Sequence, residues 1–264
     1  MLSSSTWRRG RRQRKPLSPG REAILASRVA YDACLPEVQR AELRGLVQVL
    51  LGEWSFEPGA GLEEVDETMQ VVVAAHASLV LLGRELAEIP RLRAVILYPG
   101  PYRVREERLT EEGTWVRTSE VRDGESWQHG VLVLSWDEVA HDAEHAGDGR
   151  NVVVHEMAHA LDAHTGAMNG MPPQTDAAAA ARWEEALSAA RRQARRDLRL
   201  GRKTLFDDYD AESPEEFFAA SAEAFLEMPG ALAAAYPGLY SLLRDYLHLD
   251  PIGWEDCLGA ARRS

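Results

Sequence analysis

The chain has 264 residues and a formal net charge of −12, and 45% of its residues are hydrophobic. This composition provides enough apolar side chains for a buried core and excludes a wholly disordered chain. All the acidic residues follow position 20. Because such an acidic body repels phosphate groups, we expect the main domain to bind no nucleic acid.

The first 20 residues differ from the rest. They are poor in apolar residues, and six Lys or Arg residues lie between Arg8 and Lys15. This composition predicts a disordered basic tail, followed by a single domain over residues 21–264. The twin arginine of the tail lacks the apolar stretch of an export signal, and the sequence has no apolar run of membrane-spanning length. We therefore expect a cytoplasmic protein with no membrane attachment.

The two cysteines, Cys34 and Cys257, lie far apart in the sequence and lack the spacing of metal ligands. One possible bridge is weak support for an oxidising compartment, so we predict that both are free thiols.

Along the chain, helical patterns come first, then strands, then helices again. The pattern predicts two helices within residues 23–54 with a break at Leu35-Pro36, a helix over 65–86, strands over 94–98, 102–107, 115–121 and 131–134, and helices over 150–164, 176–198, 214–228 and 239–247. Strands that are grouped in this way, rather than alternating with helices, favour an α+β fold.

The motif His155-Glu156-Met157-Ala158-His159 lies on the predicted helix over residues 150–164. One helical turn separates the two imidazoles, so both can bind one Zn²⁺, while Glu156 can take a proton from a metal-activated water. The apolar residues around the motif predict a buried helix, in which unpaired histidines would be costly. The alternative is that hydrogen bonds in the core satisfy both histidines and that Glu156 lies at the surface.

A second segment, His141-Asp142-Ala143-Glu144-His145, matches the inverted zinc motif His-x-x-Glu-His. Acidic residues surround it, and a glycine-rich turn follows. We interpret it mainly as the solvated face of a short helix, with catalysis as the alternative.

A catalytic zinc usually has three protein ligands, so a third must come from another element. The run Ser213-Pro214-Glu215-Glu216 predicts a helix start that is capped by Ser213. Spacing alone does not distinguish Glu216 from Glu212, Glu215 or Glu223 as the ligand. It also allows a capping box, in which Glu216 bonds back to the Ser213 N–H.

Most of residues 35–251 resembles the Mlc titration factor A family of zinc peptidases and, more distantly, the catalytic domain of anthrax lethal factor. Four segments carry the resemblance: Tyr98-Pro99-Gly100-Pro101-Tyr102, residues 124–136, residues 155–162 and residues 209–225. The resemblance implies a zincin-like (gluzincin) fold, with a small mixed sheet followed by a helical half that carries the zinc site.

The same resemblance implies one Zn²⁺ per chain, bound by His155, His159 and Glu216, with Glu156 as the general base. It also places a tyrosine at position 209, whose hydroxyl could stabilise an oxyanion; packing of the Tyr209 ring is the alternative.

Two further carboxylates have positions from which they could orient the ligands. Glu223 lies two turns after Glu216, and Asp162 lies one turn after His159. Solvated helix surface is the alternative for each. The strand over 131–135 could hold an extended peptide by edge pairing, with core packing as the alternative.

The motif and the family resemblance together imply a zinc-dependent, aminopeptidase-like enzyme that acts on peptides. The resemblance also implies binding of a transcriptional repressor of sugar uptake. The alternative is a non-catalytic regulatory protein that sequesters a partner and uses zinc structurally.

Overall fold

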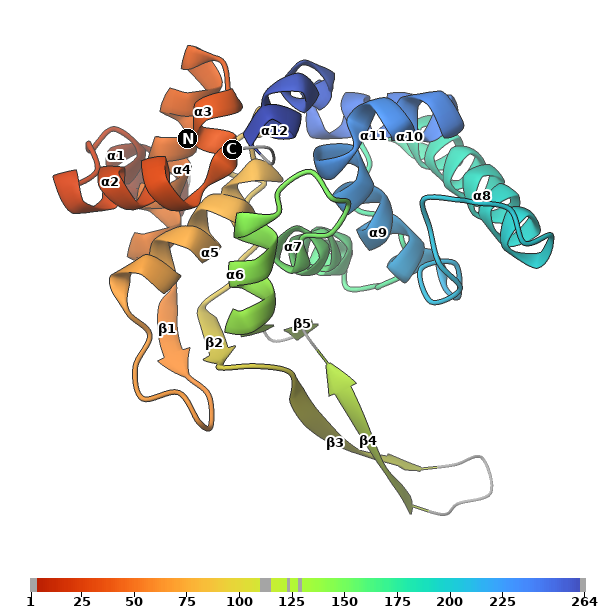
Figure 1. Cartoon of the computed structure of the whole chain (residues 1–264), viewed down its shortest axis with the longest axis horizontal. Helices are drawn as coiled ribbons and strands as arrows, with labels where there is room; N and C mark the ends of the chain where they lie inside the picture. The colour runs from red at the N-terminus through yellow and green to blue at the C-terminus, as the bar shows by residue number, and fades with distance from the viewer. Residues whose placement is uncertain (1–3, 110–114, 123, 128–129, 262–264) are drawn as a thin grey trace.

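The structure is a computed structural model that describes residues 4–109, 115–122, 124–127 and 130–261. Helices and a small sheet make up the fold (Figure 1), so the predicted α+β class is confirmed. Before the first strand lie α1 (Ser4–Gln13), α2 (Pro19–Arg28), α3 (Ala30–Cys34) and α4 (Glu37–Glu53). The predicted break at Leu35-Pro36 separates α3 from α4, and a further break at Val29 separates α2 from α3.

The main sheet has four strands in the order β1 (Ser55–Pro58), β2 (Ala94–Tyr98), β6 (Val131–Ser135) and β5 (Gly124–Trp127). The first three run parallel, and β5 pairs antiparallel with β6. A separate antiparallel hairpin consists of β3 (Tyr102–Leu109) and β4 (Trp115–Arg122). The sequence patterns predicted β2, β3, β4 and β6 but missed the two short outer strands of the sheet.

The prediction that residues 131–135 form an edge strand is wrong. Hydrogen bonds pair β6 with β2 on one side and with β5 on the other. Leu132 and Leu134 are fully buried, so this strand belongs to the core. Among the described strands, none pairs with the outer side of β5, which therefore forms the edge of the sheet.

Helix α5 (Glu67–Leu79) packs against α4 and α7. After β6 come α6 (Trp136–Glu144), α7 (Val152–Asp162), η1 (Ala163–Thr165), α8 (Ala177–Arg199), α9 (Pro214–Glu227), α10 (Pro229–Ala235), α11 (Pro237–Leu247), η2 (Pro251–Trp254) and α12 (Glu255–Ala261). Helix α7 packs against α9 and against the sheet strands β5 and β6. Burial of aromatic side chains, including Trp183, Phe217 and Phe225, anchors α8 and α9 in the core.

The predicted disorder of the basic tail is wrong for residues 4–20, whereas residues 1–3 lie outside the described residues. Helix α1 packs on α4, and Arg9 is only 7% exposed. The Arg9 guanidinium donates to Glu53 at 2.9 to 3.1 Å and to the Leu86 carbonyl at 2.7 Å. A basic segment can therefore be ordered because its charge is paired inside the fold.

Two glycines of α4 allow this close approach of α1. A Cβ atom at Gly45 would lie 3.0 Å from the Gln13 carbonyl oxygen and 2.5 Å from its Cγ, and one at Gly52 would lie 2.8 Å from Arg12 Nε. Larger residues at these positions would push α1 away from α4.

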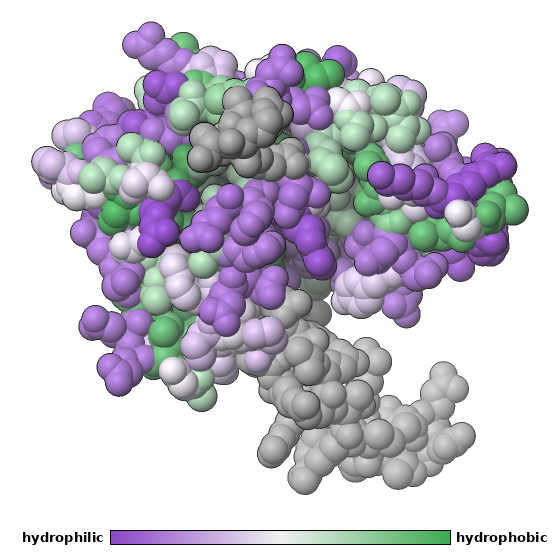
Figure 2. Space-filling model, viewed as in Figure 1, coloured by the Kyte–Doolittle hydropathy of each residue, from purple (hydrophilic) through white to green (hydrophobic). Residues whose placement is uncertain are grey.

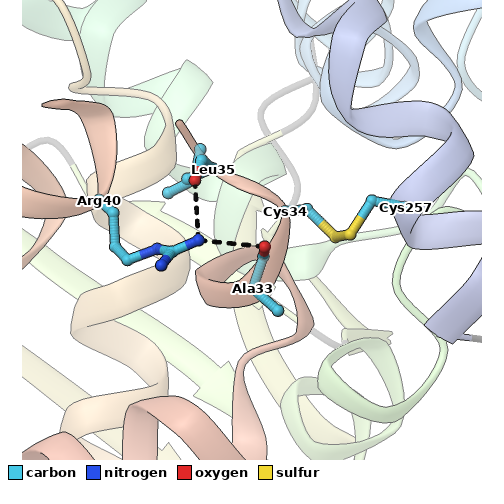
Figure 3. The surroundings of a disulfide bond; sticks show 5 residues. All are labelled: Ala33, Cys34, Leu35, Arg40 and Cys257. Atoms are coloured by element: carbon cyan, nitrogen blue, oxygen red, sulfur yellow. Dashed lines mark hydrogen bonds between the residues drawn. A yellow bond between two sulfur atoms is a disulfide. The ribbon is translucent and has the colours of Figure 1, made fainter. Parts of the chain in front are cut away.

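The prediction of free thiols is also wrong, because Cys34 and Cys257 form a disulfide with a Cα–Cα distance of 5.5 Å (Figure 3). The bond joins the end of α3 to α12. Beside it, Arg40 donates to the carbonyl oxygens of Ala33 and Leu35. A sequence separation of 223 residues gave no indication that the two cysteines are neighbours in space.

Candidate metal centre

Helix α7 brings the two histidines of the motif together. The side chain of Asn151 caps its first turn by accepting from Val154 N at 3.2 Å. His155 and His159 then lie one turn apart, with their ring centroids separated by 4.8 Å. Their Nε2 atoms are 3.1 Å apart, so both nitrogens are directed to the same point.

Helix α9 supplies the carboxylate. Ser213 caps this helix by accepting from Glu216 N at 3.2 Å. The Glu216 carboxylate lies at the histidines, with Oε2 3.2 Å from His155 Nε2 and Oε1 3.6 Å from His159 Nε2. The Ser213 cap and a ligand role for Glu216 are therefore compatible.

The donor set fits zinc. A tetrahedral zinc ion with bonds of about 2.0–2.2 Å separates its ligand atoms by roughly 3.4 Å, and the three separations found here are 3.1, 3.2 and 3.6 Å. Among the described residues, His155, His159 and Glu216 are the set of His, Cys, Asp or Glu side chains that could hold a metal ion together.

The imidazoles and carboxylates of the site lie close enough to shift each other's pKa values. Burial alone would lower the pKa of His155, but the nearby carboxylates of Glu223 and Glu216 raise it well above its usual value. Burial would likewise raise the pKa of Glu216, but its contacts with the two histidines hold that pKa far below the usual range. A bound cation would take over the role of the imidazole proton.

Glu223 orients one of the histidines. Its Oε2 accepts from His155 Nδ1 at 2.9 Å, and its Oε1 accepts from the Asn151 N–H at 2.7 Å. A carboxylate at Nδ1 leaves the Nε2 lone pair free to bind a metal. This geometry fits the predicted orienting role of Glu223.

Asp162, the other predicted orienting residue, is fully buried and accepts from Gly170 N at 2.7 Å. Burial raises its pKa, while neighbouring backbone N–H groups and the charge of His159 lower it. It fastens the loop after α7 and lies close enough to His159 to interact with its charge. A solvated position is excluded.

Glu156, the predicted base, is 4% exposed. Its charge is close enough to His155 to contribute to the raised pKa of that histidine. The alternative of a surface position for Glu156 is therefore excluded.

Tyr209, by contrast, is 61% exposed and lies on the loop before α9, where it lines a surface cavity. Its part in catalysis remains a prediction.

The competing segment lies on α6, where His141, Glu144 and His145 are exposed. The two imidazole rings stack with centroids 4.1 Å apart. Its buried member, Asp142, accepts from Val152 N at 2.7 Å and so caps the helix that carries the metal motif. Burial raises the Asp142 pKa to about 7.

The sequence patterns missed a buried polar cluster behind the site. Glu227, on α9, accepts from Tyr31 at 2.5 Å, from the Asn151 amide at 2.9 Å and from the Gly147 N–H. The same Asn151 amide donates to His76 Nδ1 at 2.9 Å. Asn151 therefore connects the start of α7 to two carboxylates of α9. Its position directly before the helix signalled a cap, but nothing in the sequence indicated the partners.

The sequence patterns also did not single out Asp210 as a residue near the metal centre. Burial raises its pKa, the charges of Asp207 and Glu223 add to this effect, and the charge of His155 lowers it. The loop before α9 thus lies close to the metal centre.

A family model for the glucose-regulated metallo-peptidases M90 matches residues 4–248. The chain belongs to this family. A protein of Synechocystis sp. is 35% identical over 249 residues, which cover 93% of this chain and 90% of the relative. Mlc titration factor A of Escherichia coli is 28% identical over 221 residues, covering 83% and 82% of the two chains. The resemblance to the Mlc titration factor A family is thereby confirmed, and so is a metallopeptidase family.

Among the described residues, no helix combines the length and the apolar character that crossing a membrane requires.

Proposed function

We propose that the chain is a zinc-dependent peptidase with one metal centre, formed by His155, His159 and Glu216. The convergence of these three donor atoms at the spacing of a tetrahedral ion carries this proposal. Bound zinc polarises a carbonyl group and lowers the pKa of a water molecule. The family membership supports a peptide bond as the target.

In this mechanism Glu156 is the general base. Glu156 is 4% exposed, and its charge lies close enough to His155 to interact with it. Its carboxylate is therefore held beside the proposed metal ligands, where a general base is needed. Glu156 takes a proton from the attacking water and delivers it to the leaving amine. We assign to the Tyr209 hydroxyl the stabilisation of the developing oxyanion, since it lies on the loop that leads into α9.

The edge strand β5 replaces β6 as the element that holds extended substrate. Its outer side faces no described strand, and β5 packs next to α7. An extended peptide can add to such an edge through backbone hydrogen bonds. We also propose that the enzyme acts as an aminopeptidase and that it is located in the cytoplasm, as expected from the sequence.

The test compares wild type with Glu156→Gln for zinc content and for hydrolysis of a chromogenic peptide panel. We expect both proteins to bind one zinc per chain and the variant to lose most turnover. Full activity in the variant would refute the role of Glu156 as general base. If wild type hydrolyses none of the peptides, the proposed peptidase function is refuted.

A second candidate function is the binding of a transcriptional repressor, which is suggested by the name Mlc titration factor A of the E. coli relative. Zinc would then have a structural role. Pull-down with the Glu156→Gln protein separates the two functions, because retained capture of the repressor without hydrolysis would assign them to different surfaces.

A further inference from the structure

A surface cavity of about 460 Å³ lies between α8 and the loop that precedes α9. Its walls consist of Arg195, Arg199, Asp208, Tyr209, Ala211 and Glu212. The proposed mechanism uses only Tyr209 from this set. The remaining residues form a cavity with a cationic wall on the helix and an acidic wall on the loop.

The cationic wall is a consequence of helical spacing. Arg191, Arg195 and Arg199 follow one another at intervals of four residues, so they share one face of α8. Arg191 donates to the carbonyl oxygens of Ala211 (3.0 Å) and Glu212, which fastens the loop to the helix. The next two arginines of this face therefore point toward a loop whose position is fixed.

Arg195 and Arg199 are exposed, and neither makes a hydrogen bond or ion pair with any described residue. The carboxylates of Asp208 and Glu212 line the same cavity, yet no described ion pair of 4.0 Å or less joins them to these arginines. The charged side chains of the two walls thus form no direct ion pair with each other. A ligand that presents a carboxylate to α8 would fill that gap.

The cavity contains the residue types of a binding surface. Tyr209, which lines it, is 61% exposed. Leu200 follows the lining residue Arg199 in the sequence and is 58% exposed. Figure 2 shows hydrophilic and hydrophobic residues next to each other at this end of the molecule, on the right. Tyrosine and arginine are enriched among the residues that dominate binding energy at interfaces.

The loop that lines the cavity also approaches the metal centre. Asp210 lies between the cavity residues Tyr209 and Ala211, and its charge interacts with those of His155 and Glu223. The same loop continues directly into α9, which carries Glu216. A peptide bound at the metal centre can therefore extend along this loop into the cavity.

We propose that Arg195 and Arg199 bind a carboxylate of the peptide substrate, and that the enzyme therefore prefers acidic peptides. This inference rests on the proposed peptidase function. A chain with a net charge of −12 otherwise repels such substrates, so a local cationic wall determines specificity.

The test measures kcat/KM for matched peptides that contain Glu, Gln or Lys at one position and end in an amide, together with a free-acid version of the Gln peptide. For wild type we expect the order Glu above Gln above Lys. In the double variant Arg195→Gln/Arg199→Gln, the Glu-to-Gln ratio falls about tenfold, since two exposed charged contacts are lost. The control Arg192→Gln/Arg196→Gln removes the same charge from exposed positions outside the cavity and keeps the wild-type ratio.

Binding gives a readout that is independent of turnover. The zinc-loaded Glu156→Gln protein should bind the Glu peptide more tightly than the Gln peptide, and the arginine double variant should abolish the difference. A preference seen only with the free-acid peptide would assign the cavity to a terminal carboxylate and still support the proposal. Equal selectivity in the arginine double variant and wild type would overturn the proposed carboxylate site. If wild type hydrolyses no peptide but still binds the Glu peptide selectively, only the proposed peptidase function is overturned.

Discussion

Replacement of Glu227 by Gln should change the pH dependence of stability in a defined direction. Glu227 is 1% exposed, and burial raises its pKa from 4.5 to about 7, even though Tyr31, Asn151 and Gly147 donate to it. In the unfolded chain its pKa returns to the ordinary value. Between the two values the folded protein keeps a proton that the unfolded chain has lost, so this group destabilises the fold as the pH rises.

The size of the effect follows from the two pKa values. A difference of about 2.5 corresponds to about 3 kcal/mol. A glutamine at position 227 has no titrating proton. Its side-chain NH2 group would face the Gly147 N–H, which is also a donor, so the variant loses that hydrogen bond at every pH. We therefore expect the unfolding free energy of Glu227→Gln, relative to wild type, to increase by about 3 kcal/mol between about pH 4 and about pH 8.

The assay is urea unfolding, followed by tryptophan fluorescence, of both proteins in the presence of a chelator, so that metal binding does not contribute. His76, with a pKa lowered to about 4 by burial, and Asp142 titrate in both proteins and cancel in the difference. Glu184→Gln makes the same substitution at an exposed position and provides the control. A difference between Glu227→Gln and wild type that stays constant across this range would refute the reasoning.

Three further outcomes follow from the structure. Under non-reducing conditions, Cys257→Ser should lower the unfolding free energy by about 2–4 kcal/mol, and treatment of wild type with a dithiol should reproduce this loss; equal stability in calorimetry would contradict the disulfide. Glu223→Gln should weaken zinc binding about 10- to 100-fold in a competition titration, because His155 loses its carboxylate partner; an unchanged affinity would show that Glu223 orients nothing. The double variant His141→Ala/His145→Ala should still bind one zinc per chain by elemental analysis, and loss of zinc would restore α6 as a metal site.

Local patterns were sufficient to predict the helix with the metal motif and the cap of α9. His155, His159 and the Ser213 start signal are short-range features of helices, and here sequence spacing determines geometry. Glu216 needed the family resemblance, since its neighbours Glu212 and Glu215 fitted the spacing equally well.

Long-range contacts could not be predicted in this way. The disulfide of Cys34 with Cys257 and the contact of Arg9 with Glu53 join distant parts of the sequence. Composition and local spacing do not reveal such contacts, and they led to the wrong predictions of two free thiols and a disordered tail. The edge position of β5 depends on strand order, which the apolar run over residues 131–135 does not encode. The errors therefore concern tertiary placement rather than local structure.

The central feature of the proposed enzyme is one zinc ion held between α7 and α9. The direct measurement is zinc per chain, together with peptide turnover on the same samples, for Glu216→Ala and for its neighbour Glu215→Ala. We predict that Glu215→Ala keeps one zinc per chain and wild-type turnover, while Glu216→Ala loses both. A Glu216→Ala protein that retains one tightly bound zinc and hydrolyses peptides at the wild-type rate would contradict the proposed centre.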